Sequence, residues 1–186
     1  TMVKSYAEMI RDLSGDNPDK RNAHIQVIIE EADRLNLLVA DLLMLSKMQS
    51  GVDALNITQF SMRDCLISLL NSYWILSEQD GYTFNYECDP NIIVTGDESR
   101  IKQVLSNLVN NAVRYSDENK EITIRVTETA DTIRCEVTDK GQGIPEEELE
   151  HIWERYYKSS SNHSRTTAGT GLGLSIAYGT VQAHRG

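Results

Sequence analysis

The stretch TGDESRIKQVLSNLVNNAVRYS, residues 95–116, predicts a helix with one apolar and one polar face. Asp97 is a favoured N-cap residue, because its carboxylate can accept hydrogen bonds from the first free backbone amides of a helix. Asn107, Asn111 and Arg114 follow at i, i+4 and i+7, so they share one helical face. The opposite face is predicted from the apolar residues at helical spacing, which are Ile101, Val104, Leu105, Leu108 and Ala112.

The polar face of this helix has two interpretations. Asn is a poor helix former, and most polar helix faces simply meet water. An Asn carbonyl oxygen is also a suitable ligand for a hard cation such as Mg²⁺, and an Arg guanidinium binds phosphate. Asn107, Asn111 and Arg114 therefore predict either a solvated surface or one wall of a metal and phosphate site.

Strands and a further helix flank this stretch on both sides. ITIRVTET (122–129) and TIRCEVTD (132–139) alternate as two half-buried strands do, with a turn at Ala130-Asp131. Upstream, the sequence predicts an extended ITQF at 57–60, a helix from about 61 to 79 and a strand at 82–88. Helices and strands are mixed, so we expect an α+β domain.

Two glycine clusters follow. In DKGQGIP, residues 139–145, glycines stand two and four residues after Asp139 at a strand end. Glycine lets the backbone come close to a ligand, so this pattern suits a flat molecule that donates a hydrogen bond to Asp139. An ordinary glycine turn would have the same pattern.

The second cluster, GTGLGLS at 169–175, leads into a predicted helix from 172 to about 183. Free amides at a helix start favour anions, and glycine lets a phosphate approach them. Leu174 stands where a dinucleotide fingerprint needs its third glycine, and the chain has no Gly-Lys pair, so neither that motif nor a P-loop is present. Gly179 and Thr180 lie inside the helix, and we expect them to fray it.

The composition excludes several functions. The 18 basic and 28 acidic residues give a net charge of −10, so a nucleic-acid partner is not expected. No apolar run approaches the roughly 20 residues of a membrane span, and the charged start of the chain is unlike a signal peptide. Cys65, Cys88 and Cys135 are odd in number and widely spaced, which favours a reducing compartment over a disulfide framework or a zinc site.

The first third of the chain predicts a helical hairpin. Apolar residues recur at 3–4–3–4 spacing from Ile25 to Leu42, as in a coiled-coil seam, and a shorter helix from Met2 to Leu13 repeats this spacing. SGDNPDK, residues 14–20, supplies the turn, with Gly15 as the predicted C-cap. Such a hairpin exposes its seam, so we expect it to pair with a second copy; packing on its own domain is the alternative.

Four segments resemble, in order and spacing, the N, G1, F and G2 boxes of bacterial sensor histidine kinases. They are NLVNNAVRYS (107–116), DKGQGIP (139–145), IWERYYK (152–158) and GTGLGLS (169–175). LLMLSKMQSG (42–51) resembles the end of that family's dimerisation and phosphotransfer hairpin, and TMVKSYAEMI resembles the stretch just after its phosphoacceptor box. The resemblance implies a partial antiparallel hairpin over 1–51. Over 56–186 it implies an ATP-binding catalytic domain, an α/β sandwich of the histidine kinase, gyrase and chaperone type.

Carried over residue by residue, the resemblance implies a site for ATP and Mg²⁺. Asp139 would accept a hydrogen bond from the adenine amino group, Tyr115 would stack on adenine and Asn111 would ligate Mg²⁺. The catalytic residues on the phosphate side would be Asn107, Arg114, Arg155 and Lys158. Residues 159–168 would form a mobile lid. Further implied ATP-binding positions are Gly141, Gly143, Ile144, Tyr156, Gly169, Thr170, Gly171, Leu172, Gly173 and Leu174.

The chain also departs from this family. The phosphoacceptor His would precede Thr1, so we expect the chain to bind ATP without phosphorylating itself at the usual place. The family continues past the final HRG through two more strands, so we expect truncation at that end as well. The histidines lack the phosphoacceptor context and are expected to be structural or solvated; they are His24, His151, His163 and His184.

The resemblance implies a protein histidine kinase whose phosphoryl group passes to an Asp of a response regulator. The expected partners are a second copy, through the hairpin, and the regulator's receiver domain. The expected location is the cytoplasmic portion of a membrane sensor. Two alternatives stay open. One is a gyrase-like or chaperone-like ATPase, which needs a catalytic acid on the Asn-rich helix, where Gln103 and Ser106 stand. The other is a non-enzymatic, nucleotide-binding dimer scaffold.

Overall fold

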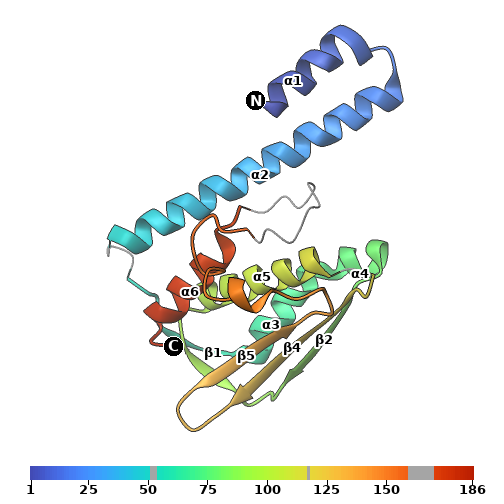
Figure 1. Cartoon of the computed structure of the whole chain (residues 1–186). Helices are drawn as coiled ribbons and strands as arrows, with labels where there is room; N and C mark the ends of the chain where they lie inside the picture. The colour runs from blue at the N-terminus through green and yellow to red at the C-terminus, as the bar shows by residue number, and fades with distance from the viewer. Residues whose placement is uncertain (51–53, 117, 159–169) are drawn as a thin grey trace.

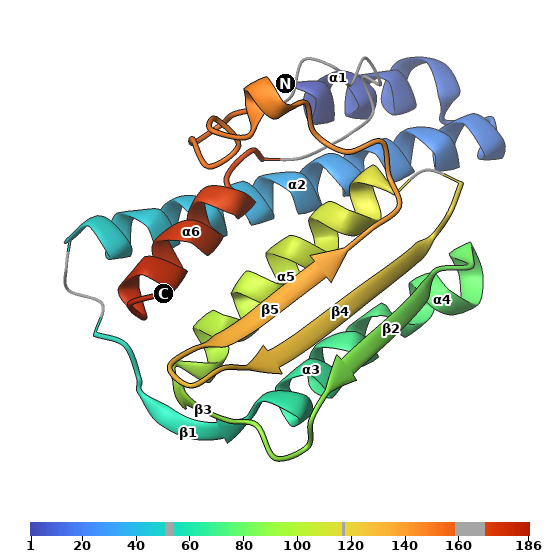
Figure 2. The same ribbon diagram turned by 60° about the horizontal axis from the view of Figure 1, so that its bottom comes forward.

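The computed structural model describes residues 1–50, 54–116, 118–158 and 170–186. These form three layers, which Figures 1 and 2 show from two sides. A sheet forms one outer layer, and helices cover one of its faces. A helical hairpin at the start of the chain lies across those helices, on the side away from the sheet.

The predicted hairpin is confirmed. Its elements are α1 (Met2–Met9), the π-helical turn η1 (Ile10–Ser14) and the long helix α2 (Pro18–Ser50). Asn17 begins α2 by accepting a hydrogen bond from the Lys20 amide at 3.0 Å. Pro18 takes the first helical position, where no backbone donor is needed. Gly15 is the C-cap of η1, as expected, but with a right-handed φ of −56°.

Ser14 holds the hairpin turn from the inside. Its side chain is buried, and its hydroxyl donates to the Met9 carbonyl at 3.1 Å. The same hydroxyl lies 3.0 Å from Nδ1 of His24, which must then act as the donor. The Tyr6 ring packs edge-on against His24, with centroids 5.3 Å apart. His24 is therefore structural, as predicted.

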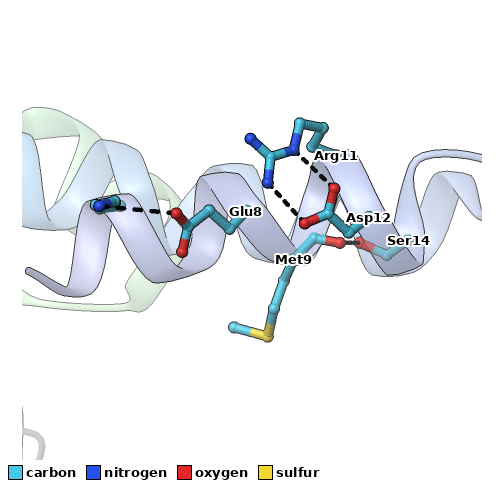
Figure 3. Close-up of polar contacts among 6 residues, drawn as sticks. Glu8, Met9, Arg11, Asp12 and Ser14 are labelled. Carbon is cyan, nitrogen blue, oxygen red and sulfur yellow. Dashed lines mark hydrogen bonds and ion pairs between the residues drawn. The ribbon is translucent and has the colours of Figure 1, made fainter.

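Figure 3 shows this bond between Ser14 and Met9, and also η1, where Arg11 makes two hydrogen bonds to Asp12 at 2.7 and 2.8 Å. The guanidinium lowers the pKa of this carboxyl. An exposed pair of this kind contributes little to stability, because water screens both charges. We infer that the buried contacts of Ser14 contribute more to the shape of the turn.

Beyond the hairpin, a short antiparallel pair joins β1 (Thr58–Ser61) to β3 (Ile93–Gly96). The sequence did not predict β3. The single helix expected at 61–79 is wrong, because the segment divides into α3 (Met62–Leu70), η2 (Asn71–Tyr73) and α4 (Trp74–Asp80). Tyr73 marks the break: its backbone leaves helical geometry, with φ −99° and ψ 4°. Its side chain is buried, and its hydroxyl donates to the side-chain oxygen of Asn110 at 2.8 Å.

The main sheet has the order β2–β4–β5, with the first pair parallel and the second antiparallel. Its strands are β2 (Thr83–Cys88), β4 (Glu121–Glu128) and β5 (Ile133–Thr138), close to the predicted ranges. The core lies between this sheet and two helices, α3 and α5 (Glu98–Tyr115). Its residues at 1% exposure or less include Met62, Cys65, Leu66, Leu105, Val109, Ile122 and Ile124.

Helix α5 (Glu98–Tyr115) confirms the helix predicted from residues 95–116. Val104 and Leu108, which were expected on the core face, are only half-buried and are not among the residues that pack on the core cluster. Asp97 is its N-cap and accepts from the Arg100 amide at 3.1 Å. Leu105 and Ala112 are buried as expected, and so is Val109, which the spacing had not singled out. The apolar face of α5 packs against the sheet, so the face that carries Asn107 and Asn111 points away from the sheet.

Helix α6 (Gly173–Ala183) follows the second glycine cluster and packs against both α5 and α2. Leu172 and Ile176 form a small buried cluster with Met44 and Leu45 of α2. The expected fraying is wrong: α6 runs unbroken past Gly179, because Thr180 is buried and stabilises this part by packing. Within the described ranges, no helix is both long and apolar enough to cross a membrane.

Candidate functional site

The polar face of α5 is the floor of the candidate site. Asn107 is half-buried, and its side-chain amide donates to the Gly173 carbonyl at 3.0 Å. Asn111 is half-buried one turn later, and Arg114 is exposed. Tyr115 ends the helix and is half-buried. The helix therefore presents the predicted polar residues in order along one side.

The DKGQGIP loop meets α5 at its far end. Asp139 directly follows β5, and its Oδ1 accepts from the Gly141 amide at 2.8 Å. A Cβ at Gly141 would collide with the Tyr115 carbonyl, so only glycine lets the loop come this close to α5. Gly143 has a φ of +75° with open space around it. Ile144 is 41% exposed. The two predicted adenine contacts, Asp139 and Tyr115, thus lie in neighbouring backbone segments.

The second glycine cluster meets α5 about two turns earlier, at Asn107. Gly173 faces the Asn107 side chain, which a Cβ would approach to 3.6 Å. Gly171, with φ +73°, lies against the Tyr156 backbone, and its carbonyl accepts from the Tyr156 amide at 2.8 Å. Leu172 is fully buried and Leu174 half-buried. Gly169 and the expected lid at 159–168 lie outside the described residues.

The segment after η3 (Glu146–Glu148) carries the predicted residues Arg155, Tyr156 and Lys158, all exposed. Tyr156 has a left-handed φ of +63°, which is unusual for a residue with a Cβ. Its bond to Gly171 places this segment beside the glycine cluster. No described hydrogen bond or ion pair joins Lys158 to the polar face of α5.

His151 also lies in this segment. It pairs with Glu154 at 2.7 Å on the surface, and this carboxylate raises its pKa. The prediction that His151 is structural or solvated is confirmed. His163 lies outside the described residues.

Asp41 is a site residue that the sequence did not indicate. It belongs to α2, and its Oδ2 accepts a hydrogen bond from the Thr170 hydroxyl at 3.0 Å. The same hydroxyl accepts from the Leu172 amide at 3.2 Å. Burial raises the pKa of Asp41, against the opposing effect of the Thr170 bond. Asp41 is 129 positions from Thr170, so no short-range pattern could have found this contact.

The candidate site suits a metal ion that is held mainly by the oxygens of a bound phosphate ligand and only in part by protein side chains. Among the described residues, no cluster of three or more His, Cys, Asp or Glu side chains could hold a metal ion. Mg²⁺ commonly takes one or two protein oxygens and completes its shell with water and phosphate oxygens. The half-buried Asn111 amide, between the two glycine clusters, can supply one such oxygen.

The two glycine clusters are anchored on α5 at residues 115 and 107, eight positions apart. At 1.5 Å per residue this is about 12 Å along the helix. One elongated ligand could therefore touch both clusters and lie on the polar face between them. Each cluster approaches α5 through a glycine, which leaves backbone amides near the ligand's path.

Two known protein families match this chain. The family described as "Histidine kinase-, DNA gyrase B-, and HSP90-like ATPase" matches residues 96–186. The "His Kinase A (phospho-acceptor) domain" matches residues 1–51. The two ranges cover more than half of the chain and include both the hairpin and the candidate site.

Curated relatives match over the whole chain. Sensor histidine kinase WalK of Bacillus subtilis (strain 168) is 32% identical over 188 residues, which are 100% of this chain and 31% of WalK. Sensor histidine kinase TrcS of Mycobacterium tuberculosis is 33% identical over 189 residues, 99% of this chain and 36% of TrcS. The chain therefore spans about a third of the length of these relatives.

Solved structures share the fold. Histidine kinase AdeS of Acinetobacter baumannii superposes with a TM-score of 0.77 at 23% identity, covering 98% of this chain and 82% of AdeS. Histidine kinase ThkA, solved in complex with the response regulator protein TrrA, gives 0.75 at 27% identity and covers 95% of this chain and 48% of that one.

Fold and site together define an ATPase-type α/β domain that follows a phosphoacceptor-type helical hairpin. The chain belongs to the sensor histidine kinases.

Proposed function

We propose that this chain is the ATP-binding catalytic unit of a sensor histidine kinase, together with part of its phosphotransfer hairpin. It binds ATP on the polar face of α5 and transfers the γ-phosphate to a histidine outside residues 1–186. That phosphohistidine then passes the phosphoryl group to an Asp of a response regulator.

One observation carries this proposal: α5 joins both glycine clusters. Gly141 rests on the Tyr115 carbonyl and Gly173 accepts from Asn107, with Asn111 between them. Phosphoryl transfer needs positioning and charge neutralisation more than covalent chemistry from the protein. A helix that places a purine loop, an amide ligand and an anion-binding helix start in one line supplies that positioning.

The residues take the following roles. Asp139 accepts from the adenine amino group, and Tyr115 covers the ring. Asn107 and Arg114 orient the phosphate chain, and the amides at the start of α6 bind its oxygens. Arg155 and Lys158, exposed beside the glycine cluster, offset charge on the γ-phosphate during transfer.

Asn111 would hold Mg²⁺ through its amide oxygen, and the metal when bound would neutralise phosphate charge. The remaining ligands would be phosphate and water oxygens, because the described residues offer no carboxylate cage. Asn111 therefore orients a metal–nucleotide complex rather than holding a resident metal.

The proposed partners are a second copy and a response regulator. The hairpin leaves its apolar seam open to solvent in the single chain, with Leu35 47%, Val39 56% and Leu42 48% exposed. A seam of this kind favours pairing with another hairpin. The similarity to ThkA, which was solved with TrrA, supports a regulator as the phosphoryl acceptor.

A labelled-ATP experiment tests the proposal. The chain is incubated with [γ-³²P]ATP, Mg²⁺ and a longer form of the same protein that carries the phosphoacceptor histidine but has Asp139→Asn in its own site. Label on that acceptor, stable to alkali and lost in acid, is expected. Phosphate release without protein label would favour an ATPase, and binding with neither product would favour a scaffold. Either result would overturn the kinase proposal.

A further inference from the structure

Helix α6 is tied to α5 at both of its ends. At its start, the Gly173 carbonyl accepts from Asn107 at 3.0 Å. At its end, Nε2 of His184, the C-cap residue, accepts from the Asp97 amide at 3.0 Å. Asp97 is the N-cap of α5. One bond at each end therefore sets the position of α6 along α5.

The His184 ring is held in one orientation and one tautomer. Its Nδ1 lies 2.8 Å from the Thr180 carbonyl, which can only accept, so Nδ1 carries the proton and Nε2 is free to accept. Gly96 makes room for the ring: a Cβ there would lie 3.2 Å from Cδ2 of His184 and 2.9 Å from Ile101. The ring thus fills space at the end of β3 that a side chain at position 96 would otherwise occupy.

Asp97 connects this contact to the segment that follows the hairpin. Its Oδ2 accepts from the Asn56 amide at 3.0 Å, and its Oδ1 accepts from Ser99 and Arg100. Burial would raise the pKa of this carboxyl, but these donors outweigh it and lower the pKa, which favours the ionised form. Asp97 therefore joins the chain leaving the hairpin, the start of α5 and the end of α6.

Helix α6 also packs against a second element, α2. Leu172 and Ile176 pack against Met44 and Leu45 of α2, and Thr170 bonds to Asp41. A helix moves as a rod, so a shift toward α2 would move the glycine cluster away from Asn107. The bond from His184 to Asp97 opposes that shift at the far end of the rod.

We propose that His184 is a positioning residue that fixes α6 on α5 and so places Thr170–Gly173 against the phosphate chain of the nucleotide. This inference rests on the proposed function. The inference goes beyond that function because it assigns a role in phosphate binding to a residue at the C-terminal end of α6, whereas the glycine cluster lies at the N-terminal end. Since the adenine loop is anchored separately at Tyr115, the effect is specific to the phosphate end.

Calorimetry with two ligands tests this. The dissociation constants of AMP and of a nonhydrolysable ATP analogue are measured for the chain, His184→Ala and His184→Gln. His184→Ala should weaken the ATP analogue by about 5- to 10-fold, the loss of one hydrogen bond, and AMP by less than twofold. A Gln amide oxygen can accept from the Asp97 amide, so His184→Gln should recover most of the affinity. Gln182→Ala, exposed on the same helix end, is the control and should change neither constant.

A general loosening of the fold would weaken both ligands equally, and that result would overturn the inference. So would a His184→Gln variant as weak as His184→Ala, or no change in either. Gly96→Ala displaces the ring without removing it and should show the same selective loss, which keeps the test valid if His184→Ala does not fold. If the unmodified chain binds neither ligand, the proposed function fails and this inference with it. Normal binding that is indifferent to residue 184 overturns the inference alone.

Discussion

The α-carbon of Gly141 faces the carbonyl oxygen of Tyr115 so closely that no side chain fits between them. This contact joins the loop after β5 to the last residue of α5. It also fixes Asp139, whose carboxylate accepts from the Gly141 amide at 2.8 Å. Close backbone approach, rather than glycine's flexibility, explains why a side chain is excluded here.

Gly141 and Gly143 should therefore respond differently to alanine. Gly141→Ala forces a methyl group against a backbone carbonyl that cannot rotate away, and we expect it to reduce the free energy of unfolding by about 3 kcal/mol. Gly143→Ala meets open space and bears only the strain of its φ of +75°, about 1 kcal/mol. Urea unfolding of both variants measures the difference. Equal losses would show that Tyr115 does not restrict this position.

Asp139→Asn tests the proposed adenine contact without disturbing the loop. The Asn carbonyl oxygen can still accept from the Gly141 amide, so the local turn should survive. An amide cannot replace the charged acceptor, and we expect the Kd for an ATP analogue to rise about 10- to 100-fold. Asp131→Asn, at the exposed turn between β4 and β5, removes the same charge away from the site. Unchanged affinity in Asp139→Asn, by calorimetry, would remove Asp139 from the site.

The sequence predicted best what short-range patterns specify. The N-cap at Asp97, the two faces of α5 and the β4–β5 pair all depend on neighbours within a few residues, and all are present. It missed β3, because a four-residue strand is defined by its partner β1 and not by its own pattern. It also predicted fraying at Gly179, since the burial of Thr180 depends on the packing of α6 and not on local propensity.

In the candidate site, too, the sequence predicted the local features and missed the long-range ones. Its residue types could be predicted, because Asn spacing and glycine clusters are local features of the sequence. The contacts that place them could not. Thr170 meets Asp41 from 129 positions away, and His184 meets Asp97 from 87 positions away. Both contacts exist only because α6 packs between α5 and α2.

Asn111→Ala should remove the magnesium dependence of nucleotide binding. Asn111 is the half-buried amide between the two glycine clusters, whereas Asn110 turns away and bonds to Tyr73 at 2.8 Å. Asn110→Ala removes the same side-chain amide at the neighbouring position and therefore serves as the control. ATP-analogue affinity is measured with Mg²⁺ and with EDTA for both variants. If Mg²⁺ strengthens binding to Asn111→Ala as much as to the unmodified chain, the metal ligand lies elsewhere.

Asp41→Asn should make the chain more stable at neutral pH. Burial raises the pKa of Asp41 above its ordinary value of 3.8, although Thr170 opposes the shift. The folded state thus holds this proton more tightly than the unfolded state does. As pH rises from 3.8 through the raised value, ionisation lowers the free energy of unfolding, and above that window the loss is constant. Below 3.8 the carboxyl is neutral in both states and the effect disappears.

An Asn at position 41 stays neutral at every pH, and its carbonyl oxygen can still accept from Thr170. Its advantage over the unmodified chain should therefore grow from pH 4 and then level off. We expect less than about 1 kcal/mol, because Asp41 is only half-buried and solvent screens its charge. Urea midpoints between pH 4 and 8 measure this, with Asp33→Asn on the exposed side of α2 as the matched loss of charge. An advantage that stays flat with pH, or that Asp33→Asn reproduces, would mean that net charge and not the Thr170 contact governs the effect.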